Sequence, residues 1–395
     1  MVLTIHEQLK NSIQNAKRIL VVTRPLPEGA PPLTFADGLG AGLALCQFLK
    51  RCGKNVDFVA PGYGRHSRFA FLPEIASAQN DLQNAQKFVI KLNVADTKIS
   101  DLRYEMKDGE LRIHITPKYG EINPEKLATH AEDFSYDLMI TLDTPDLGSL
   151  GSLYEKNVKL FSSTPVINID SRAENEQYGA VNAVDTTASS TCEVVFSHLE
   201  QMDRALIDAH IATCLLTGLV TKTKCFQKTR SPKTFEAASR LISLGARREE
   251  VMQQLYRNRS LASFRLWGTV LANLNHDETK KFTWVALTAR DFLSTGGSED
   301  ELPAVVEELI LDTPETNTVL ILYEKTTPGE LCGLLFSTAI LDTQALLNSI
   351  VSWDRVRQDN LITSPGFIRF CIKEDDIARA EDKIVEMIKK NLYTA

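Results

Sequence analysis

Apolar and polar positions alternate along the first two-thirds of the chain in a way that predicts strands and helices in turn. Apolar runs of strand length predict strands at 19–23, 55–62, 87–94, 136–146 and 165–170. Apolar residues at helical spacing predict helices over 37–53, 188–202 and 207–223. The stretch 102–117 alternates on both sides of Asp108-Gly109, which predicts a hairpin. Strands and helices in this order, with acidic residues at strand ends, are typical of a doubly wound, mostly parallel sheet.

The rest of the chain predicts a connector and then a second unit. Residues 231–276 have a helical pattern throughout, and from Lys280 onward short apolar strands reappear around an acidic segment. We therefore expect an α/β fold in three parts, namely a doubly wound, mostly parallel sheet domain, a helical connector, and a second, smaller α/β domain. The predicted bounds of these parts are 1–230, 231–277 and 278–395.

Composition narrows the class of protein. The chain has 395 residues and a net charge of −7, whereas a general nucleic-acid binder that relies on phosphate contacts is usually basic. Its seven cysteines form no CxxC pair, which predicts buried free thiols in a reducing compartment. The first 20 residues have the pattern of an amphipathic helix rather than a signal peptide, and no run approaches the ~18 apolar residues of a membrane span. We expect a soluble, cytoplasmic protein that does not contact membranes.

Two predicted strands end in a carboxylate. Asp143 closes one apolar run, and Asp170 closes the next one along the chain, where it is followed at once by Ser171 and Arg172. Parallel strands place such residues together at the carboxyl edge of the sheet, which is where α/β proteins bind their ligands. The sequence therefore predicts a site at this edge, built from acidic and basic residues together.

Four segments carry a family resemblance. They are TRPLPEGAPPLTFADGLGAG, LMITLDTPDLGSLG, NIDSRAENEQYGAVNAVDTTASSTCE and GLVTKTKCF, which begin at residues 23, 138, 168 and 218. In this order they resemble the motifs of the DHH phosphoesterase superfamily, and within it the branch of oligoribonucleases and phosphoadenosine-phosphate phosphatases. The resemblance covers nearly the whole chain. It implies a parallel-sheet domain that carries two Mn²⁺ or Mg²⁺ ions, a helical connector, and a DHH-associated domain that binds the substrate.

The chain departs from these motifs at the metal ligands. About eight residues, APPLTFAD, are inserted before the second aspartate of the first motif. In the second domain, Phe336 occupies the position of an arginine that binds phosphate in the family. The segment 349–366, which contains Arg355 and Arg357, replaces the family's GGGH loop. The family's metal ligands are replaced by Arg24 and Glu28 in the first motif, by Ser171 and Arg172 in the third, and by Lys222 in the fourth, while Asp37, Asp143 and Asp170 remain as vestigial ligands.

The substitutions oppose metal binding physically. Arginine offers no lone pair, and both arginine and lysine are cations at pH 7. A cation ~4 Å from a bound ion repels it by ~4 kcal/mol at an effective dielectric of ~20, which is about three decades of affinity. Arg24, Arg172 and Lys222 therefore replace the ions as counter-charges, and we expect no metal cofactor. A simpler interpretation is that Asp143 and Asp170 persist only as strand-end caps or ion-pair partners.

Three hypotheses of function remain. In the first, the chain is a catalytically inactive homologue that acts as a ligand sensor or as the partner of an active paralogue or of a second copy. In the second, a phosphate-containing small molecule or a short oligonucleotide binds in the interdomain cleft. In the third, a metal-dependent phosphodiesterase or phosphatase retains one Mn²⁺ or Mg²⁺ on the three aspartates and acts on short oligonucleotides or nucleotides. The residues that would bind the ligand of the second hypothesis are Arg24, Arg172, Lys222, Asn175 and Ser337.

Overall fold

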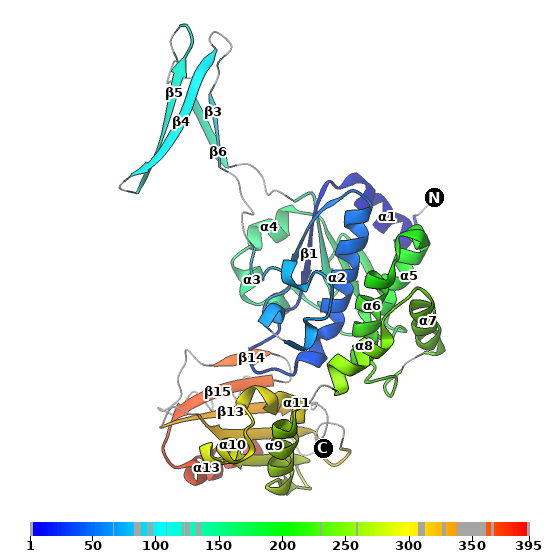
Figure 1. Cartoon of the computed structure of the whole chain (residues 1–395), viewed down its shortest axis with the longest axis vertical. Helices are drawn as coiled ribbons and strands as arrows, with labels where there is room; N and C mark the ends of the chain where they lie inside the picture. The colour runs from blue at the N-terminus through cyan, green and yellow to red at the C-terminus, as the bar shows by residue number, and fades with distance from the viewer. Residues whose placement is uncertain are drawn as a thin grey trace.

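The computed structural model describes most of the chain (Figure 1). The described residues are 3–65, 67–82, 88–92, 94, 98–107, 109–120, 122, 127–131, 136–229, 231–257, 260–306, 313–325, 329–337, 361–364 and 367–392.

A five-stranded parallel sheet forms the centre of the first domain, in the order β2-β1-β7-β8-β9. Every residue of β7 is buried, as expected for a parallel sheet that is covered on both faces. Four of the predicted strands are thereby confirmed, and β9 was not predicted. The strands are β1 (Arg18–Thr23), β2 (Asn55–Val59), β7 (Leu138–Leu142), β8 (Val166–Asp170) and β9 (Val181–Val184). The helices around them are α1 (Ile5–Asn15), α2 (Ala36–Arg51), α3 (Ser152–Glu155), α4 (Val158–Ser163), α5 (Thr191–Asp203) and α6 (Ala209–Lys222).

Glycines let α2 approach its neighbours closely. A Cβ atom on Gly38 would collide with the Thr23 hydroxyl, and one on Gly42 would collide with the ring of Phe58. A Cβ atom on Gly40 would meet the backbone of α6. These residues therefore serve tight packing of α2 against β1, β2 and α6.

A two-ribbon arm projects from the first domain (Figure 1). In one ribbon β3 (Phe88–Leu92) pairs with β6 (Leu127–Ala131), and in the other β4 (Ile99–Lys107) pairs with β5 (Glu110–Pro117), both antiparallel. The predicted hairpin is confirmed. The predicted strand at 87–94 is also confirmed over β3, but it belongs to the arm and not to the parallel sheet.

Helices connect the two domains. They are α7 (Pro232–Ser243), α8 (Arg248–Met252), a π-helical turn (Gln253–Arg257) and α9 (Leu261–Ala272). The predicted helical pattern over 231–276 is confirmed for these ranges.

A six-stranded mixed sheet, in the order β10-β11-β12-β13-β15-β14, forms the second domain. Only β11 and β12 run parallel among its described pairs. Its strands are β10 (Asn275–Asp277), β11 (Phe282–Leu287), β12 (Thr318–Glu324), β13 (Glu330–Ser337), β14 (Ile362–Ser364) and β15 (Phe367–Lys373), and its helices are α10 (Ala289–Thr295), α11 (Leu302–Val305) and α13 (Ile377–Asn391). Most of the segment 349–366, with Arg355 and Arg357, lies outside the described residues.

Two details correct the expectations from composition. Cys332 and Cys371, directly opposite each other on β13 and β15, form a disulfide, so the prediction of free thiols throughout was wrong for this pair. The sequence spacing does not predict this disulfide, because the two cysteines are 39 residues apart and not in a CxxC pair.

The helical segment Pro32–Arg51 is long and apolar enough to cross a membrane, but 94% of its apolar window is buried, as in the core helix of a folded domain.

Candidate functional site

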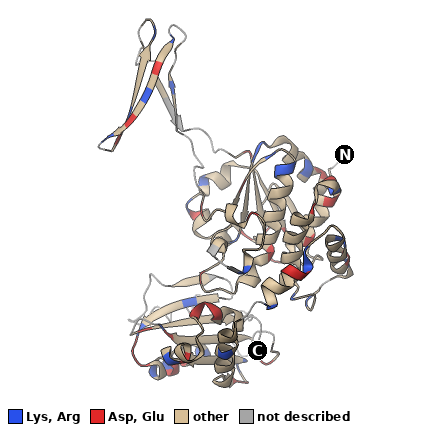
Figure 2. Ribbon diagram, in the orientation of Figure 1, with Lys and Arg blue, Asp and Glu red and all other residues tan. Residues whose placement is uncertain are grey.

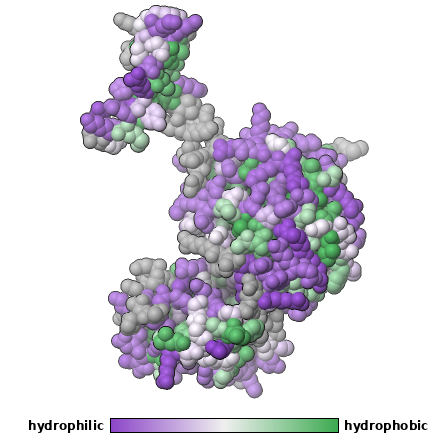
Figure 3. Space-filling view, in the orientation of Figure 1, coloured by the Kyte–Doolittle hydropathy of each residue, from purple (hydrophilic) through white to green (hydrophobic). Residues whose placement is uncertain are grey.

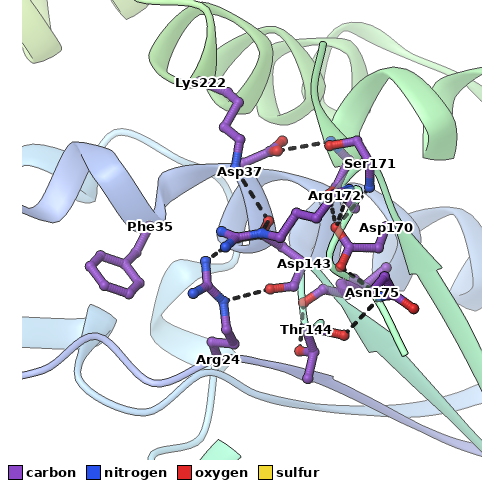
Figure 4. Close-up of polar contacts among 12 residues, drawn as sticks. Arg24, Phe35, Asp37, Asp143, Thr144, Asp170, Ser171, Arg172, Asn175 and Lys222 are labelled. Carbon is purple, nitrogen blue, oxygen red and sulfur yellow. Dashed lines mark hydrogen bonds and ion pairs between the residues drawn. The ribbon is translucent and has the colours of Figure 1, made fainter. Parts of the chain in front are cut away.

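The carboxyl ends of β1, β7 and β8 bring the predicted site residues together (Figure 4). Arg24 follows β1, Asp143 follows β7, and Asp170 is the last residue of β8. Lys222, at the end of α6, and Arg172, just after β8, complete a cluster around one carboxylate. We call Arg24, Asp143, Arg172 and Lys222 the cation cluster.

Asp143 is the centre of the cation cluster. Nε of Arg24 donates to its backbone carbonyl at 2.5 Å, and Nη2 donates to Oδ2 at 2.8 Å. Asp143 itself has a φ of 50°, in the left-handed region that few non-glycine residues adopt. The Arg24 guanidinium also lies 5.2 Å from the centroid of the Phe35 ring. Arg24 is therefore fixed by a charge, a carbonyl and an aromatic face.

Two further cations share the same carboxylate. Arg172 donates through Nε to Oδ1 of Asp143 at 2.9 Å, and through Nη2 to Oδ2 at 3.3 Å. Nζ of Lys222 lies 3.5 Å from Oδ1. The Asp143 side chain is only 2% exposed, whereas Arg172 and Lys222 are 19% and 23% exposed. Solvent therefore reaches the cations more easily than the carboxylate.

The charges around Asp143 decide its ionisation. Burial by itself would raise the pKa of Asp143, but the positive charges of Arg172, Lys222 and Arg24 outweigh burial and hold that pKa well below its usual range. Burial would likewise lower the pKa of Arg172, yet the adjacent Asp143 carboxylate raises it. Both groups are therefore ionised at neutral pH.

Asp37 performs a different task. Its Oδ2 accepts the backbone N–H of Thr191 at 2.8 Å, and its Oδ1 accepts that of Cys192 at 3.0 Å. The carboxylate thus satisfies N–H groups in the first turn of α5, where a negative charge is favourable. Complete burial raises the pKa of Asp37 to about 6, although the nearby Lys222 charge acts in the opposite direction.

Asp170 is held by its own loop. Its Oδ1 accepts the backbone N–H of Ser171 at 2.7 Å and that of Arg172 at 3.2 Å. Its Oδ2 accepts Nδ2 of Asn175 at 2.8 Å. Burial raises the pKa of Asp170 and the Asp143 charge adds to this effect, while the Asn175 hydrogen bond opposes it. Asn175 therefore positions a carboxylate in this structure.

The three aspartates do not fit a pair of divalent ions. Each of the oxygens just named already accepts a hydrogen bond from a backbone N–H, an amide or a guanidinium. Among the residues that the structure describes, no group of three or more His, Cys, Asp or Glu side chains is arranged to hold a metal ion. Mn²⁺ and Mg²⁺ prefer oxygen ligands, chiefly carboxylates, and Mn²⁺ also tolerates imidazole. A carboxylate oxygen that accepts one hydrogen bond can still bind a metal, so the obstacle is charge: binding of two ions at Asp143 would require Arg24, Arg172 and Lys222 to move away from its carboxylate.

Glu28 of the first motif and Ser337, a predicted ligand-binding residue in the second domain, lie outside the cation cluster. Glu28 forms an ion pair with Arg369 of β15, Oε1 to Nη1 at 2.7 Å, which joins the two domains. Ser337 bonds to the hydroxyl of Thr318 at 2.9 Å and to the carbonyl of Asn317, both in the second domain. Phe336 packs against Phe367 with ring centroids 5.0 Å apart.

A cleft of about 870 Å³ lies between the domains. The inserted segment 30–37 forms part of its wall, since Ala30 and Pro32 line it. The carbonyl of Phe35 accepts the Tyr63 hydroxyl at 2.8 Å, which anchors this segment. The charged side chains that line the cleft are Glu28, Arg68, Glu299, Asp300, Glu301 and Arg369. The residues expected to bind a ligand in the cleft are not part of this lining, namely Arg24, Arg172, Lys222, Asn175 and Ser337.

Sequence reasoning did not find Arg369. It lies in the strand FIRFCIK, where alternation places it opposite Ile368 and Phe370 and on the same face as Phe367 and Cys371. That isolated cation in an apolar strand is the only signal in the sequence, and it does not reveal the partner.

Comparisons with known proteins support the motif assignment. Residues 35–219 match the DHH family, N-terminal domain. Cyclic-di-AMP phosphodiesterase PdeA of Listeria monocytogenes is 30% identical over 218 residues, a match that covers 47% of this chain and 33% of that protein. The match therefore spans about a third of the relative's length.

Solved structures support the fold. An exopolyphosphatase-related protein from Bacteroides fragilis aligns over 98% of this chain and 95% of its own, with a TM-score of 0.66 and 16% identity. CDC45 from Entamoeba histolytica aligns over 98% of this chain and 100% of its own, with a TM-score of 0.48 and 8% identity. The first likeness supports the fold, and the second is too weak to support any argument. The predicted branch of oligoribonucleases and phosphoadenosine-phosphate phosphatases stays a prediction. The motifs and the matched region together show that residues 35–219 of this chain form a domain of the DHH phosphoesterase superfamily.

Proposed function

We propose that this chain is a catalytically inactive DHH-family protein that binds a phosphate-containing ligand or partner at the cation cluster, at the carboxyl edge of the parallel sheet, rather than in the cleft itself, whose charged lining is mostly acidic. The observation that supports this proposal is the shared carboxylate of Asp143, which is paired with Arg24, Arg172 and Lys222. Metal-dependent hydrolysis needs an ion that lowers the pKa of a bound water. Cations fixed by a carboxylate supply positive charge but do not activate water in this way.

Two of the cations are suited to an anionic ligand. Lys222 has a long contact to Asp143, 3.5 Å, and a side chain that is 23% exposed. Arg172 is 19% exposed and carries a planar guanidinium, which binds phosphate in a bidentate manner. A phosphate group would compete with Asp143 for these two residues. The N-terminus of α5 is a poorer anion site, because Asp37 already accepts its first N–H groups.

The test measures metal, binding and turnover on the same protein. Bound Mn²⁺ is measured by elemental analysis after dialysis. Binding of cyclic-di-AMP, short oligonucleotides and phosphoadenosine phosphate is measured by calorimetry without metal, and phosphate or nucleotide release is measured with Mn²⁺ present. We expect binding of at least one of these compounds without metal and no turnover. Cyclic-di-AMP is included because a protein named for that activity is a relative.

A pair of lysine variants makes the test specific. Lys222→Ala removes one cation of the cluster and weakens ligand binding. Lys50→Ala, which removes a surface ion pair with Glu74 at 2.8 Å, leaves binding unchanged. Binding that is equal in both variants contradicts a role for the cation cluster in ligand recognition.

The alternative is a phosphodiesterase or phosphatase with a reduced metal site on Asp37, Asp143 and Asp170. The name of the Listeria relative favours it. Turnover of a nucleotide substrate that requires Mn²⁺ and is lost in Asp170→Asn would establish this alternative and refute the inactive homologue. We also propose a cytoplasmic location and a partnership with an active paralogue.

A further inference from the structure

The ribbon β4–β5 has one wholly apolar face. Its strands pair so that Leu102, Tyr104 and Met106 on β4 lie directly opposite Ile115, Ile113 and Leu111 on β5. Because side chains alternate across a strand, these three cross-strand pairs share one face. We call these six residues the apolar ladder.

The apolar ladder is left open in the single chain. Leu102, Tyr104 and Met106 are 61%, 75% and 81% exposed, and Leu111 is 57% exposed. Figure 3 shows apolar residues gathered on the projecting arm. A two-stranded ribbon is only marginally stable in water unless one face packs against another element. The ribbon therefore needs a covering surface.

The opposite face is polar and electrically balanced. Figure 2 shows both signs of charge along the ribbon. The two strands contain three acidic residues (Asp101, Glu105, Glu110) and three basic ones (Arg103, Lys107, Arg112), so the charges cancel. Ion pairs join several of them, such as Arg103 to Asp101 at 2.7 Å and Arg112 to Glu110 at 2.9 Å. A ribbon without net charge neither selects a polyanion nor repels a copy of itself.

We propose that the apolar ladder is the homodimer interface of this protein, in which two ribbons pack face to face about a two-fold axis. An isologous contact requires a patch that is complementary to itself, and a flat apolar face of three rungs meets this condition. Six side chains of this size with about half of their surface open bury roughly 500 Å² per chain, or about 1,000 Å² per dimer, which is the lower limit of a specific interface. The arm projects away from the domains, so two bodies do not collide when the ribbons meet (Figure 1).

Symmetry predicts which residues meet. A two-fold axis between two stacked ribbons lies in the plane between them, and its two simplest directions run along the strands or across them at the middle rung. In both arrangements the middle rung, Tyr104 and Ile113, faces the middle rung of the second copy. Tyr104 therefore contacts either Tyr104 or Ile113 of that copy, at the spacing of about 10 Å between packed sheets.

The test is sedimentation velocity of the full chain, from about 1 to 100 µM, the range expected for an interface of this area. The wild type is expected to reach twice the chain mass of 44.0 kDa as concentration rises. The variant Tyr104→Ser with Met106→Ser is expected to raise the dimer dissociation constant at least tenfold. The matched control, Arg103→Ser with Glu105→Ser, changes the opposite face of the same strand and leaves the dissociation constant unchanged.

Cross-linking locates the contact independently. Tyr104→Cys alone, or mixed with Ile113→Cys, is expected to give disulfide-linked dimers under mild oxidation, whereas Arg103→Cys gives none above the background of the native cysteines. A wild type that stays monomeric over the whole range overturns the proposal, whatever other protein covers the ladder. A dimer that survives the apolar substitutions overturns it equally, because it uses another surface. None of these outcomes depends on whether the cation cluster binds phosphate.

Discussion

Arg24 and Asp143 are joined through two atoms of one guanidinium, with Nε on the backbone carbonyl at 2.5 Å and Nη2 on the carboxylate at 2.8 Å. The arginine thus satisfies both the main chain and the side chain of a residue with φ 50°. A contact of this kind ties the end of β1 to the end of β7. The pair is therefore a structural element of the sheet edge as well as part of the site.

Removal of Arg24 should destabilise the fold. In Arg24→Ala the buried carboxylate loses one of three cations and the Asp143 carbonyl loses its donor, so we expect a loss of about 2–3 kcal/mol in the free energy of unfolding. Urea denaturation measures it. Arg103→Ala, whose partner Asp101 is on the surface of the arm, serves as the control and should leave the midpoint unchanged. Equal midpoints for Arg24→Ala and the wild type would show that Lys222 and Arg172 alone satisfy Asp143.

Asp37 should make the protein less stable as pH rises from about 4 to about 6. Its pKa is raised from 3.8 to about 6, so the folded state holds the proton more tightly than the unfolded state, and that stabilisation is lost as pH rises through this window. His198, whose pKa is lowered to about 4 by burial, acts in the opposite direction over the same range. The informative quantity is therefore the difference in the free energy of unfolding between Asp37→Asn and the wild type.

We expect this difference to change by on the order of 2 kcal/mol in favour of Asp37→Asn between pH 4 and pH 7. Urea denaturation at several pH values measures it, and Asp203→Asn, at the last residue of α5, serves as the control variant. Below about pH 4 the depressed pKa of Asp143 has the reverse effect, because its ion pairs are lost as the pH falls. A flat difference for Asp37→Asn would mean that Asp37 is ionised throughout.

Reversal of the charge at position 222 should increase the affinity of the site for Mn²⁺. Lys222→Asp removes the cation nearest to solvent in the cluster and adds a ligand oxygen, so its affinity for Mn²⁺ should exceed that of the wild type by at least tenfold. Lys222→Met removes the charge but adds no ligand, and should give an intermediate affinity. Isothermal titration with MnCl₂ distinguishes the three proteins. Tight stoichiometric binding to the wild type would show that the cations do not exclude metal.

The disulfide should stabilise the second domain. Opening the bond Cys332–Cys371, 39 residues apart, is expected to cost up to roughly 4 kcal/mol in the chain-entropy model. Denaturation of the wild type with and without a reductant, and of Cys332→Ser with Cys371→Ser, measures this loss. Cys52→Ser, at an exposed free cysteine, is the control. A reductant that shifts the double variant as much as the wild type would assign the effect to another thiol.

The ion pair between Glu28 and Arg369 should hold the cleft closed. It is partly exposed, so Glu28→Gln should change stability little, but it removes a direct bond between the domains. Small-angle scattering should therefore show a larger radius of gyration for Glu28→Gln than for the wild type. Glu74→Gln breaks an ion pair of similar length within the first domain, Lys50 to Glu74 at 2.8 Å, and should leave the radius of gyration unchanged.

The fold class could be predicted because the hydrophobic pattern of short stretches determines the type of each helix and strand. The strands β7 and β8 at the sheet centre are mostly apolar and are buried at every position, and the end of each strand marks the edge where the site forms. Motif order likewise predicted that Arg24, Arg172 and Lys222 share one region. The sequence pattern does not predict which partner a side chain contacts. It did not show that Asp37 accepts N–H groups of α5 or that Glu28 pairs with Arg369, because both contacts join segments far apart in the chain.

Close packing of α2 has a consequence for the shape of this site. Gly38 and Gly218 bring the helix against β1 and α6 so tightly that an added methyl group would strike Thr23 at the first and Cys192 at the second. The main chain thereby fixes the size of the space between Asp37 and Asp143. With α2 held by backbone contact, this edge of the sheet accommodates the long side chains of Arg24, Arg172 and Lys222 around Asp143 without displacement of a helix.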